Sequence, residues 1–478
     1  MSKFKHHGTA LLLTLTLGGC ISLAPNYQRP ASELPSDWKS PEGQSAASLG
    51  KTWWTIFGDE QLNRMVGEAL AHNANLAVAV ARVDEARAQL GETRSGQFPV
   101  VDATYSRDRT QSSLRTAMPL PPGVVRERDN YRGTLNVSYE LDLWGRLHNA
   151  TAASRADLLA TEAARETVRI TLAADVVQAY FALRSLDEQV AATQRSVSSR
   201  GESLALQQKR YDAGVISEFE YRQLEAEELA ARAQLPVLES RRTRQENALA
   251  VLLGRSPRAI YSDAVVEKAA ATDAPIASQK ALVVPAGLPS ELLLRRPDLV
   301  EAEQRMIAAN ARIGVARAAY FPSLSITGFF GGESANMSNL FTGPAGTWQA
   351  AGTLTQPIWN AGRVGSQVDT ASARQRQALA QYQSAIQNAF REVRDAVVAQ
   401  AKTREQFEAE DKRAATLREA LRLAKLRYTS GVASQLDVLD SERNLLAAEL
   451  NRSDALRAQR AAVADLLKAL GGGWGPGS

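Results

Sequence analysis

Residues 130–145 read N-Y-R-G-T-L-N-V-S-Y-E-L-D-L-W-G. The odd positions from 131 to 143 are apolar, aromatic or glycine, and the even positions from 132 to 142 are all polar. Because successive side chains of a strand point to opposite faces, this pattern predicts one strand with an apolar face and a polar face. Two structures contain such strands: a soluble β-sandwich, or an outer-membrane barrel whose apolar face meets lipid and whose polar face lines a wet lumen. The strand alone favours the sandwich, and the rest of the chain favours the barrel.

The composition points to long helices and away from catalysis. The chain has 478 residues, 6% aromatic residues, and 56 basic against 52 acidic side chains. This length exceeds one ordinary core, and the nearly balanced charge gives no reason to expect nucleic acid. The sequence has no phosphate-binding loop, nucleophile elbow or metalloprotease motif, and only four histidines. We therefore expect no enzyme, no cofactor and no metal site.

The amino terminus has the pattern of a secretory leader. Lys3 and Lys5 precede a short apolar run at 9–17, and L-G-G-C follows, ending at Cys20. The run is too short to span a bilayer as a helix. L-G-G-C resembles the bacterial lipobox, which implies cleavage before Cys20 and a covalent lipid on it, and Ile21 in place of Asp implies the outer membrane. The alternative is an unmodified cysteine at the end of a leader.

The chain contains an internal two-fold repeat. Phe98-Pro99 recurs as Phe321-Pro322 at an offset of 223, and the R-Y-x-x-G turn at 210–214 recurs at 427–431 at an offset of 217. Each copy predicts a helix, a strand, an exposed loop, a second strand, a long helix, a turn and a final helix. Residues 146–211 contain no proline, and at about 1.5 Å per residue they predict a helix of roughly 100 Å.

Four amphipathic strands per chain are too few to close a membrane barrel. Open strand edges in lipid leave backbone groups unpaired, at several kcal/mol each. Other copies of the chain must therefore supply the missing strands. An eight-stranded barrel is filled by its own side chains, so two copies would make a plug and three copies would make a pore.

Three motifs carry a resemblance to a known family. They are L-R-R-P-D-L-V-E-A-E at 294–303, A-R-A-A-Y-F-P-S-L at 316–324, and the two R-Y-x-x-G turns. They are similar to the outer-membrane efflux proteins, in particular the NodT-like lipoprotein branch that serves resistance–nodulation–division (RND) pumps. The resemblance implies a mixed α and β membrane protein, a homotrimer with a 12-stranded transmembrane β-barrel, four strands per chain. The barrel would continue into a long periplasmic α-helical barrel with an equatorial α/β belt.

The resemblance also implies partners and a role. The chain would be a passive exit duct for drugs or other small toxic solutes, working with a periplasmic adaptor (membrane fusion) protein, an inner-membrane RND pump and the lipid bilayer. Two alternatives stay open: an outer-membrane channel for type I protein secretion, and a non-channel periplasmic helical adaptor or structural protein.

The expected domains follow the repeat. They are 1–19 signal peptide, 20–60 acylated extended segment, 61–97 first helix repeat, 98–144 first barrel hairpin, 145–254 long helices and tip turn, 255–290 equatorial segment, 291–321 second helix repeat, 322–359 second barrel hairpin, 360–470 long helices and tip turn, and 471–478 C-terminal tail.

The family resemblance places a periplasmic gate at the R-Y-x-x-G turns. In the second copy it implies Tyr428, Asp437 and Asp440, and the two aspartates, three positions apart, share one helix face. In a trimer each would form a ring of three carboxylates, which favours cations. The alternative is two solvated carboxylates near a helix start, where the helix dipole favours them. A gatekeeping arginine of some relatives falls at Ala433.

Glycines close both turns. Gly214 and Gly431 occupy the last position of each R-Y-x-x-G motif, and a glycine there is typical of a helix C-terminus.

Overall fold

The computed structural model of the chain describes residues 22–31, 50, 52–115, 121, 123–261 and 296–472. The expected leader at 1–19, Cys20, most of the expected equatorial segment at 255–290, and 473–478 of the expected tail lie outside these residues.

The chain folds as two compact units that are discontinuous in sequence. The sheet unit comprises Met1–Ala31, Arg82–Glu162 and Glu301–Gln383, and the helical unit comprises Ser32–Ala81, Ala163–Val300 and Ser384–Ser478. Two of the unit boundaries fall inside the helices at 146–212 and 363–429, so each of these helices contributes residues to both units.

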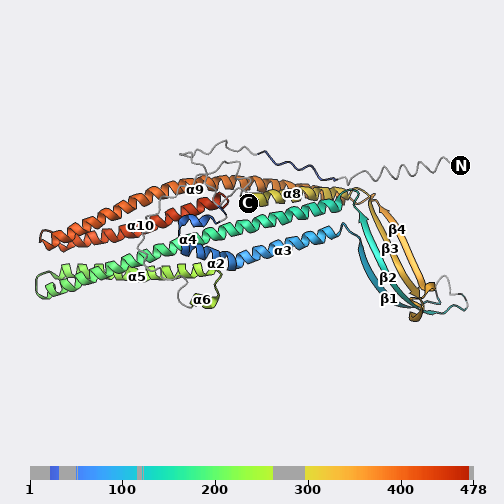
Figure 1. Ribbon diagram of the computed structural model, residues 1–478, viewed down its shortest axis with the longest axis horizontal. Coiled ribbons are helices and arrows are strands. Elements are labelled where there is room, and N and C mark those ends of the chain that lie inside the picture. The colour runs from blue at the N-terminus through green and yellow to red at the C-terminus, as the bar shows by residue number, and fades with distance from the viewer. Residues whose placement is uncertain are drawn as a thin grey trace. The chain divides into compact units, whose positions relative to one another are not determined.

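The sheet unit contains one four-stranded antiparallel sheet in the order β1-β2-β3-β4 (Figure 1). The strands are β1 (Val100–Gln111), β2 (Glu127–Leu141), β3 (Ser323–Ser334) and β4 (Gly346–Thr355). Two 3₁₀ turns, η3 (Met337–Asn339) and η4 (Gly343–Ala345), lie between β3 and β4. The strand predicted at 130–145 is therefore β2, one of the two central strands, and it ends at Leu141.

The first hairpin is longer than the sequence indicates. Residues 107–129 are polar and carry no apolar alternation, a pattern that predicts an exposed loop. In the structure β1 continues to Gln111 and β2 begins at Glu127. Opposite charges hold these polar strand ends together: Arg109 pairs with Glu127 at 2.8 Å and Arg107 with Asp129 at 3.3 Å. Ion pairs between neighbouring strands can stabilise strand pairing even where the sequence has no alternation of apolar and polar residues.

The helices come in pairs of equal length. α3 (Ala74–Ser95) and α8 (Pro297–Ala318) have 22 residues each, α4 (Arg146–Asp212) and α9 (Arg363–Thr429) have 67 each, and α5 (Glu218–Leu252) and α10 (Gln435–Ala469) have 35 each. The two members of each pair begin 223, 217 and 217 positions apart. No helix in the described part of the chain is long and apolar enough to span a membrane.

Within the helical unit, the four long segments lie in the order α5-α4-α10-α9. Arg242 of α5 binds Asp187 of α4 at 2.7 Å, and Ser185 of α4 hydrogen-bonds Ser453 of α10 at 3.0 Å. Arg452 of α10 in turn pairs with Asp411 of α9. Polar contacts thus join each helix to the next.

A hydrophobic core lies at the C-terminal ends of α5 and α10 and in the middle of α4 and α9, where η1 (Trp53–Phe57) and α2 (Glu60–His72) pack against these helices. Trp53 and Phe57 are buried there, and the Phe57 ring lies 5.1 Å from that of Phe181 on α4. The apolar stretch W-W-T-I-F at 53–57 predicts an ordinary core cluster, and the burial of Trp53, Trp54 and Phe57 confirms this. Other members of the core include Leu62, Val66, Val176, Tyr180, Leu183, Leu249, Leu253, Leu466 and Leu467.

The spacing of apolar residues predicts one helix from about 59 to 95, but the structure has two helices there, α2 and α3. Asn73 adopts an extended backbone (φ −66°, ψ 127°) between α2 and α3. Its side-chain oxygen accepts hydrogen bonds from the backbone N–H groups of Asn75 at 2.9 Å and Leu76 at 3.2 Å. Asn73 therefore caps α3, and a capping side chain favours a helix start over a continuous helix.

Candidate gate at the helix tips

The turns that join α4 to α5 and α9 to α10 have the same backbone geometry. Gly214 (φ +69°) and Gly431 (φ +76°) follow the two long helices in the left-handed conformation that glycine tolerates. The N–H of Val215 donates to the carbonyl of Arg210 at 2.8 Å, and that of Gly214 to Tyr211 at 2.8 Å. These two bonds form a Schellman motif.

The matching bonds of the second turn run from Val432 to Arg427 at 3.0 Å and from Gly431 to Tyr428 at 2.9 Å. The two R-Y-x-x-G stretches therefore form the tight turns of two helical hairpins. In each turn the glycine of the motif adopts the left-handed conformation that ends the long helix.

Asp437 takes part in the N-terminal cap of α10. The backbone N–H and the hydroxyl of Ser434 donate to the Asp437 carboxylate at 2.8 and 2.9 Å, and the Asp437 N–H donates back to the Ser434 hydroxyl at 3.3 Å. These bonds form a capping box, and the hydrogen bonds from Ser434 lower the pKa of the exposed Asp437 carboxyl. Ser217 and Glu220 form the same box at the start of α5.

Asp440 is exposed and paired within its own helix. Arg443 donates to one carboxylate oxygen at 2.6 Å and Asn444 to the other at 3.0 Å. Both aspartates thus have local partners at a helix start, as the alternative interpretation of this pair requires. A carboxylate that is exposed and bonded within its own helix still carries its negative charge. These contacts therefore also agree with a ring of three carboxylates in a trimer.

Tyr428 makes a contact that the sequence does not predict. Its hydroxyl accepts hydrogen bonds from Arg210 at 2.7 Å and from Gln207 at 3.0 Å, and both donors lie on α4. Gln207 is almost fully buried. The bonds tie α9 to α4 one turn before both tips. The matching residue of the first copy, Tyr211, instead stacks on Tyr221, with ring centroids 5.4 Å apart.

The expected lipidation residue, Cys20, precedes a described segment at 22–31 that docks on the sheet unit. Ser22 donates to Asn149 at 2.9 Å, and Arg29 binds both carboxylate oxygens of Glu303, at 2.7 and 2.6 Å. Tyr27 also donates to Glu303, at 2.9 Å. Burial and this hydrogen bond raise the pKa of Tyr27. The segment that follows Cys20 is therefore held along α8.

The described residues contain no group of three or more His, Cys, Asp or Glu side chains placed to hold a metal ion.

These features define a chain that joins a small antiparallel sheet to two long helical hairpins, a class represented among known outer-membrane channels. The model of the family described as "Outer membrane efflux protein" matches residues 65–255 and 288–472. The chain belongs to this family, and it is an outer-membrane component of an efflux system.

Individual relatives cover nearly the whole chain. It is 38% identical over 476 residues to "Outer membrane protein OprJ" of Pseudomonas aeruginosa, covering 98% of this chain and 96% of the relative. It is 33% identical over 464 residues to "Probable outer membrane lipoprotein SilC" of Salmonella typhimurium, covering 96% of each. The solved CmeC outer membrane channel of Campylobacter jejuni superposes with a TM-score of 0.87 at 29% identity, covering 96% of each chain.

Proposed function

We propose that three copies of this chain form the outer-membrane exit duct of a tripartite RND-type efflux system. The three sheets would combine into one 12-stranded barrel around a water-filled lumen, and the long helices would form a periplasmic α-helical barrel with an equatorial belt. The equal lengths of the paired helices support the duplicated unit on which this arrangement depends.

The observation that carries the proposal is a sheet with an exposed apolar face and two unpaired edges. Within the described residues, β1 pairs only with β2 and β4 only with β3. On one face, Leu135, Phe330 and Trp348 share a row and are 54%, 70% and 74% exposed. A face this apolar needs lipid or protein against it, and unpaired edges in lipid need further strands.

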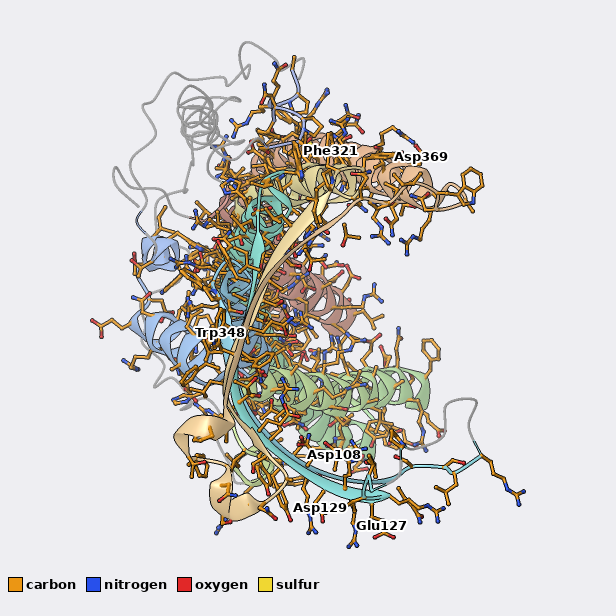
Figure 2. The ribbon with its side chains drawn as sticks, turned by 90° about the vertical axis from the view of Figure 1, so that its right-hand side faces the viewer. Asp108, Glu127, Asp129, Phe321, Trp348 and Asp369 are labelled. Carbon is orange, nitrogen blue, oxygen red and sulfur yellow. The ribbon has the colours of Figure 1, made fainter. Side chains whose placement is uncertain are left out.

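The apolar face has the height of a membrane band. Its rows run from Leu141, at the end near the helices, to Gly133, eight positions away along β2. At about 3.3 Å per residue this is roughly 26 Å, close to the band of about 25 Å in outer-membrane barrels. Figure 2 shows Trp348 between Phe321 at one end of the sheet and Asp108, Glu127 and Asp129 at the other. Charged pairs therefore begin where the apolar rows stop.

The opposite face suits a wet lumen. Asn136 donates to Thr104 at 2.8 Å, and Asn130 donates to Glu333 at 2.9 Å. The Arg132 guanidinium lies 4.4 Å from the centre of the Phe329 ring. Polar groups that bond across strands and to water can line a channel without selecting one cargo.

The helix tips would form the gate. Rings of Asp437 and Asp440 would give the constriction a negative field that favours cations, and the Tyr428 contact to Arg210 would hold the two hairpins of one protomer together in the resting state. An inner-membrane pump would provide the energy for transport through a periplasmic adaptor. A lipid on Cys20 would anchor each protomer to the membrane.

Deletion of the gene from its host tests the efflux function. We expect deletion to raise the accumulation of small toxic compounds, the wild-type chain to restore export, and the set of secreted proteins to stay unchanged. A loss of secreted proteins with unchanged accumulation of small solutes would contradict this proposal and favour the type I secretion alternative.

A further inference from the structure

The connection between β3 and β4, residues 335–345, lies over the face of the sheet and is anchored there by Leu340. This side chain is 1% exposed. A Cβ on Gly332 would lie 2.2 Å from the Leu340 carbonyl oxygen, and a Cβ on Gly133 would lie 3.6 Å from the Leu340 methyl group Cδ2. Two neighbouring glycines therefore form a seat into which the connection fits, and a larger side chain at Gly332 would displace it.

The seat is on the apolar face. Gly332 pairs with Gly133 and with Gly346 across the sheet, two positions from the row of Leu135, Phe330 and Trp348. Side chains two positions apart on a strand share a face. Tyr105, in the same row as Gly133, donates its hydroxyl to the Met337 sulfur at 3.7 Å. The connection thus covers the face that the proposed barrel turns outward.

The connection carries apolar groups to the boundary of the apolar band. Phe341 is 88% exposed and Met337 is 47% exposed. On one side of the seat is the row that contains Phe330 and Trp348, and on the other the polar positions begin with Arg107 and Arg109. Aromatic side chains at such a boundary are typical of the two membrane–water interfaces of outer-membrane barrels.

We propose that residues 335–345 are a membrane-interface anchor that inserts Phe341 and Met337 among the lipids of the outer leaflet. The inference rests on the proposed barrel and adds a lipid-binding role for a connection that would otherwise be an extracellular loop. We infer that lipid, and not another copy of the chain, contacts residues 335–345, because the glycine seat lies over the central strands β2 and β3. A neighbouring copy would join at the edge strands β1 and β4.

Spin labels on single introduced cysteines can test this in lipid vesicles. The three positions are Phe341→Cys on the anchor, Trp348→Cys on the apolar band and Thr353→Cys on the polar face, with the unsubstituted chain as the labelling background for Cys20. Oxygen partitions into lipid and a neutral nickel chelate stays in water, so the ratio of the two collision rates reports the surroundings. We expect this ratio to be severalfold higher at Phe341 and Trp348 than at Thr353.

A second pair of variants tests the glycine seat. Gly332→Val, combined with Phe341→Cys, should lower the ratio at position 341 to that of Thr353 and leave Trp348→Cys unchanged. Gly352→Val is the matched control, since a Cβ there meets no atom within 4 Å, and it should leave position 341 unchanged.

Each outcome has a distinct meaning. A water-like ratio at position 341 with a lipid-like ratio at 348 would overturn the anchor and leave the barrel standing. Exclusion of both reagents from position 341 would place a neighbouring protein on the patch and also overturn the anchor. A water-like ratio at 348 would contradict the barrel itself.

Discussion

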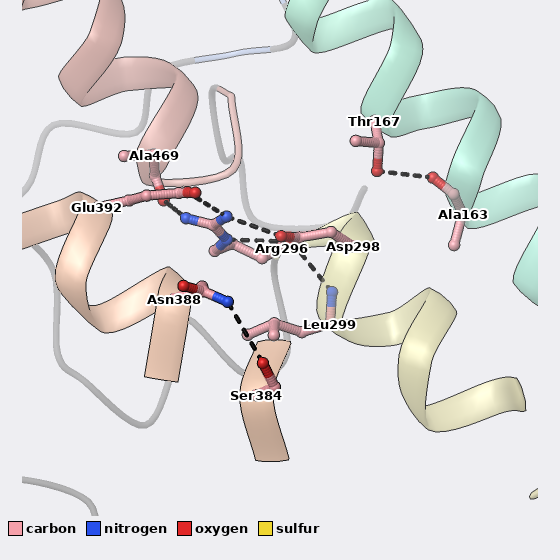
Figure 3. A network of polar contacts seen from close by, with 9 residues as sticks. All are labelled: Ala163, Thr167, Arg296, Asp298, Leu299, Ser384, Asn388, Glu392 and Ala469. Carbon is pink, nitrogen blue, oxygen red and sulfur yellow. Dashed lines mark hydrogen bonds and ion pairs between the residues drawn. The ribbon is translucent and has the colours of Figure 1, made fainter. Parts of the chain in front are cut away.

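The guanidinium of Arg296 donates a hydrogen bond of 2.7 Å to the backbone carbonyl of Ala469 at the end of α10 (Figure 3). The same buried side chain binds Asp298 in the first turn of α8 and Glu392 of α9, each at 2.7 Å. One cation thus joins α9 and α10 to the first turn of α8. In the sequence, Arg295-Arg296 directly before Pro297 indicates a structural hinge more than an anion site, and the contacts of Arg296 agree with a structural role.

The first copy makes the same junction with a neutral side chain. Asn73 donates to the carbonyl of Leu252 at 2.9 Å, and Leu252 precedes Ala469 by 217 positions. Asp175 stands at the position that matches Glu392, and burial raises the pKa of its carboxyl. The two junctions therefore differ in chemistry, and in the second copy a charged network also includes α9.

Replacement of Arg296 by methionine should destabilise the helical unit. The change keeps a long apolar side chain but removes the hydrogen bonds of Arg296 to Glu392 and to the Ala469 carbonyl. Asp298 keeps only the hydrogen bond from the Leu299 N–H. Because Glu392 is 44% exposed, we expect a loss of about 2 kcal/mol, below the 3–5 kcal/mol typical of fully buried pairs. Denaturant unfolding followed by circular dichroism measures the change. Arg305→Met, which removes a surface pair on the same helix, should change the stability by less than about 0.5 kcal/mol.

Replacement of Tyr428 by phenylalanine should loosen the tips. It removes the acceptor of Arg210 and Gln207 and leaves the ring in place, so the α4–α9 contact weakens while the fold is kept. We expect a higher single-channel conductance or more frequent open events in planar bilayers. Tyr211→Phe, at the matching position of the first copy, should behave as the wild type. Equal conductance of Tyr428→Phe and the wild type would show that this contact does not hold the gate.

Replacement of Asp437 and Asp440 by alanine should raise the conductance or weaken block by divalent cations. Asp437 also completes the capping box with Ser434, so its loss weakens the start of α10. Glu220→Ala removes the same cap from α5 and is the control for that effect. If Glu220→Ala changes divalent block as much as the two aspartate variants do, the cap and not the charge is responsible, and the ring assignment is wrong.

The charge of Asp437 should persist in mild acid. Its pKa is lowered by the hydrogen bonds from Ser434, so the carboxylate stays ionised as the pH falls to the ordinary aspartate range of about 3.9. Divalent block that depends on Asp437 should therefore be retained at mildly acidic pH and be lost only below that range. Conductance titrations with Asp440→Ala as the background isolate this residue. Loss of the block well above the ordinary range would contradict the assignment to Asp437.

Tyr180 should make the helical unit sensitive to alkali. Burial and a 2.6 Å hydrogen bond to Asp59 raise the pKa of its phenol. The neutral phenol is thus favoured in the folded state, and its stabilising effect is complete below the unfolded pKa of about 10 and is lost as the pH rises above it. Tyr180→Phe should lower the free energy of unfolding by about 1–2 kcal/mol at neutral pH. It should also make the decrease of that free energy above pH ~10 less steep. An unchanged alkaline slope would exclude Tyr180 as its source.

The sequence predicts the regular elements best where a local pattern repeats. The two tip glycines, the alternation in β2 and the proline-free run of α4 each depend on residues close in the chain, and the structure has the corresponding elements. The polar end of β1 and the division at Asn73 were missed because cross-strand ion pairs and a side-chain cap leave no hydrophobic period.

The partners of Tyr428 and Arg296 could not be predicted, because they come from distant parts of the chain. Arg210 and Gln207 lie 218 and 221 positions from Tyr428, and Ala469 lies 173 positions from Arg296. The capping role of Asp437 had a sequence signal, the serine three positions before it, which the gate interpretation left unused.

The number of copies in the membrane tests the proposed duct most directly. Native mass spectrometry of the lipidated chain in mild detergent should give a mass three times that of one mature chain. The same preparation should conduct ions across a planar bilayer, because twelve strands enclose a lumen that four cannot. A folded monomer that passes no ions would contradict the shared barrel.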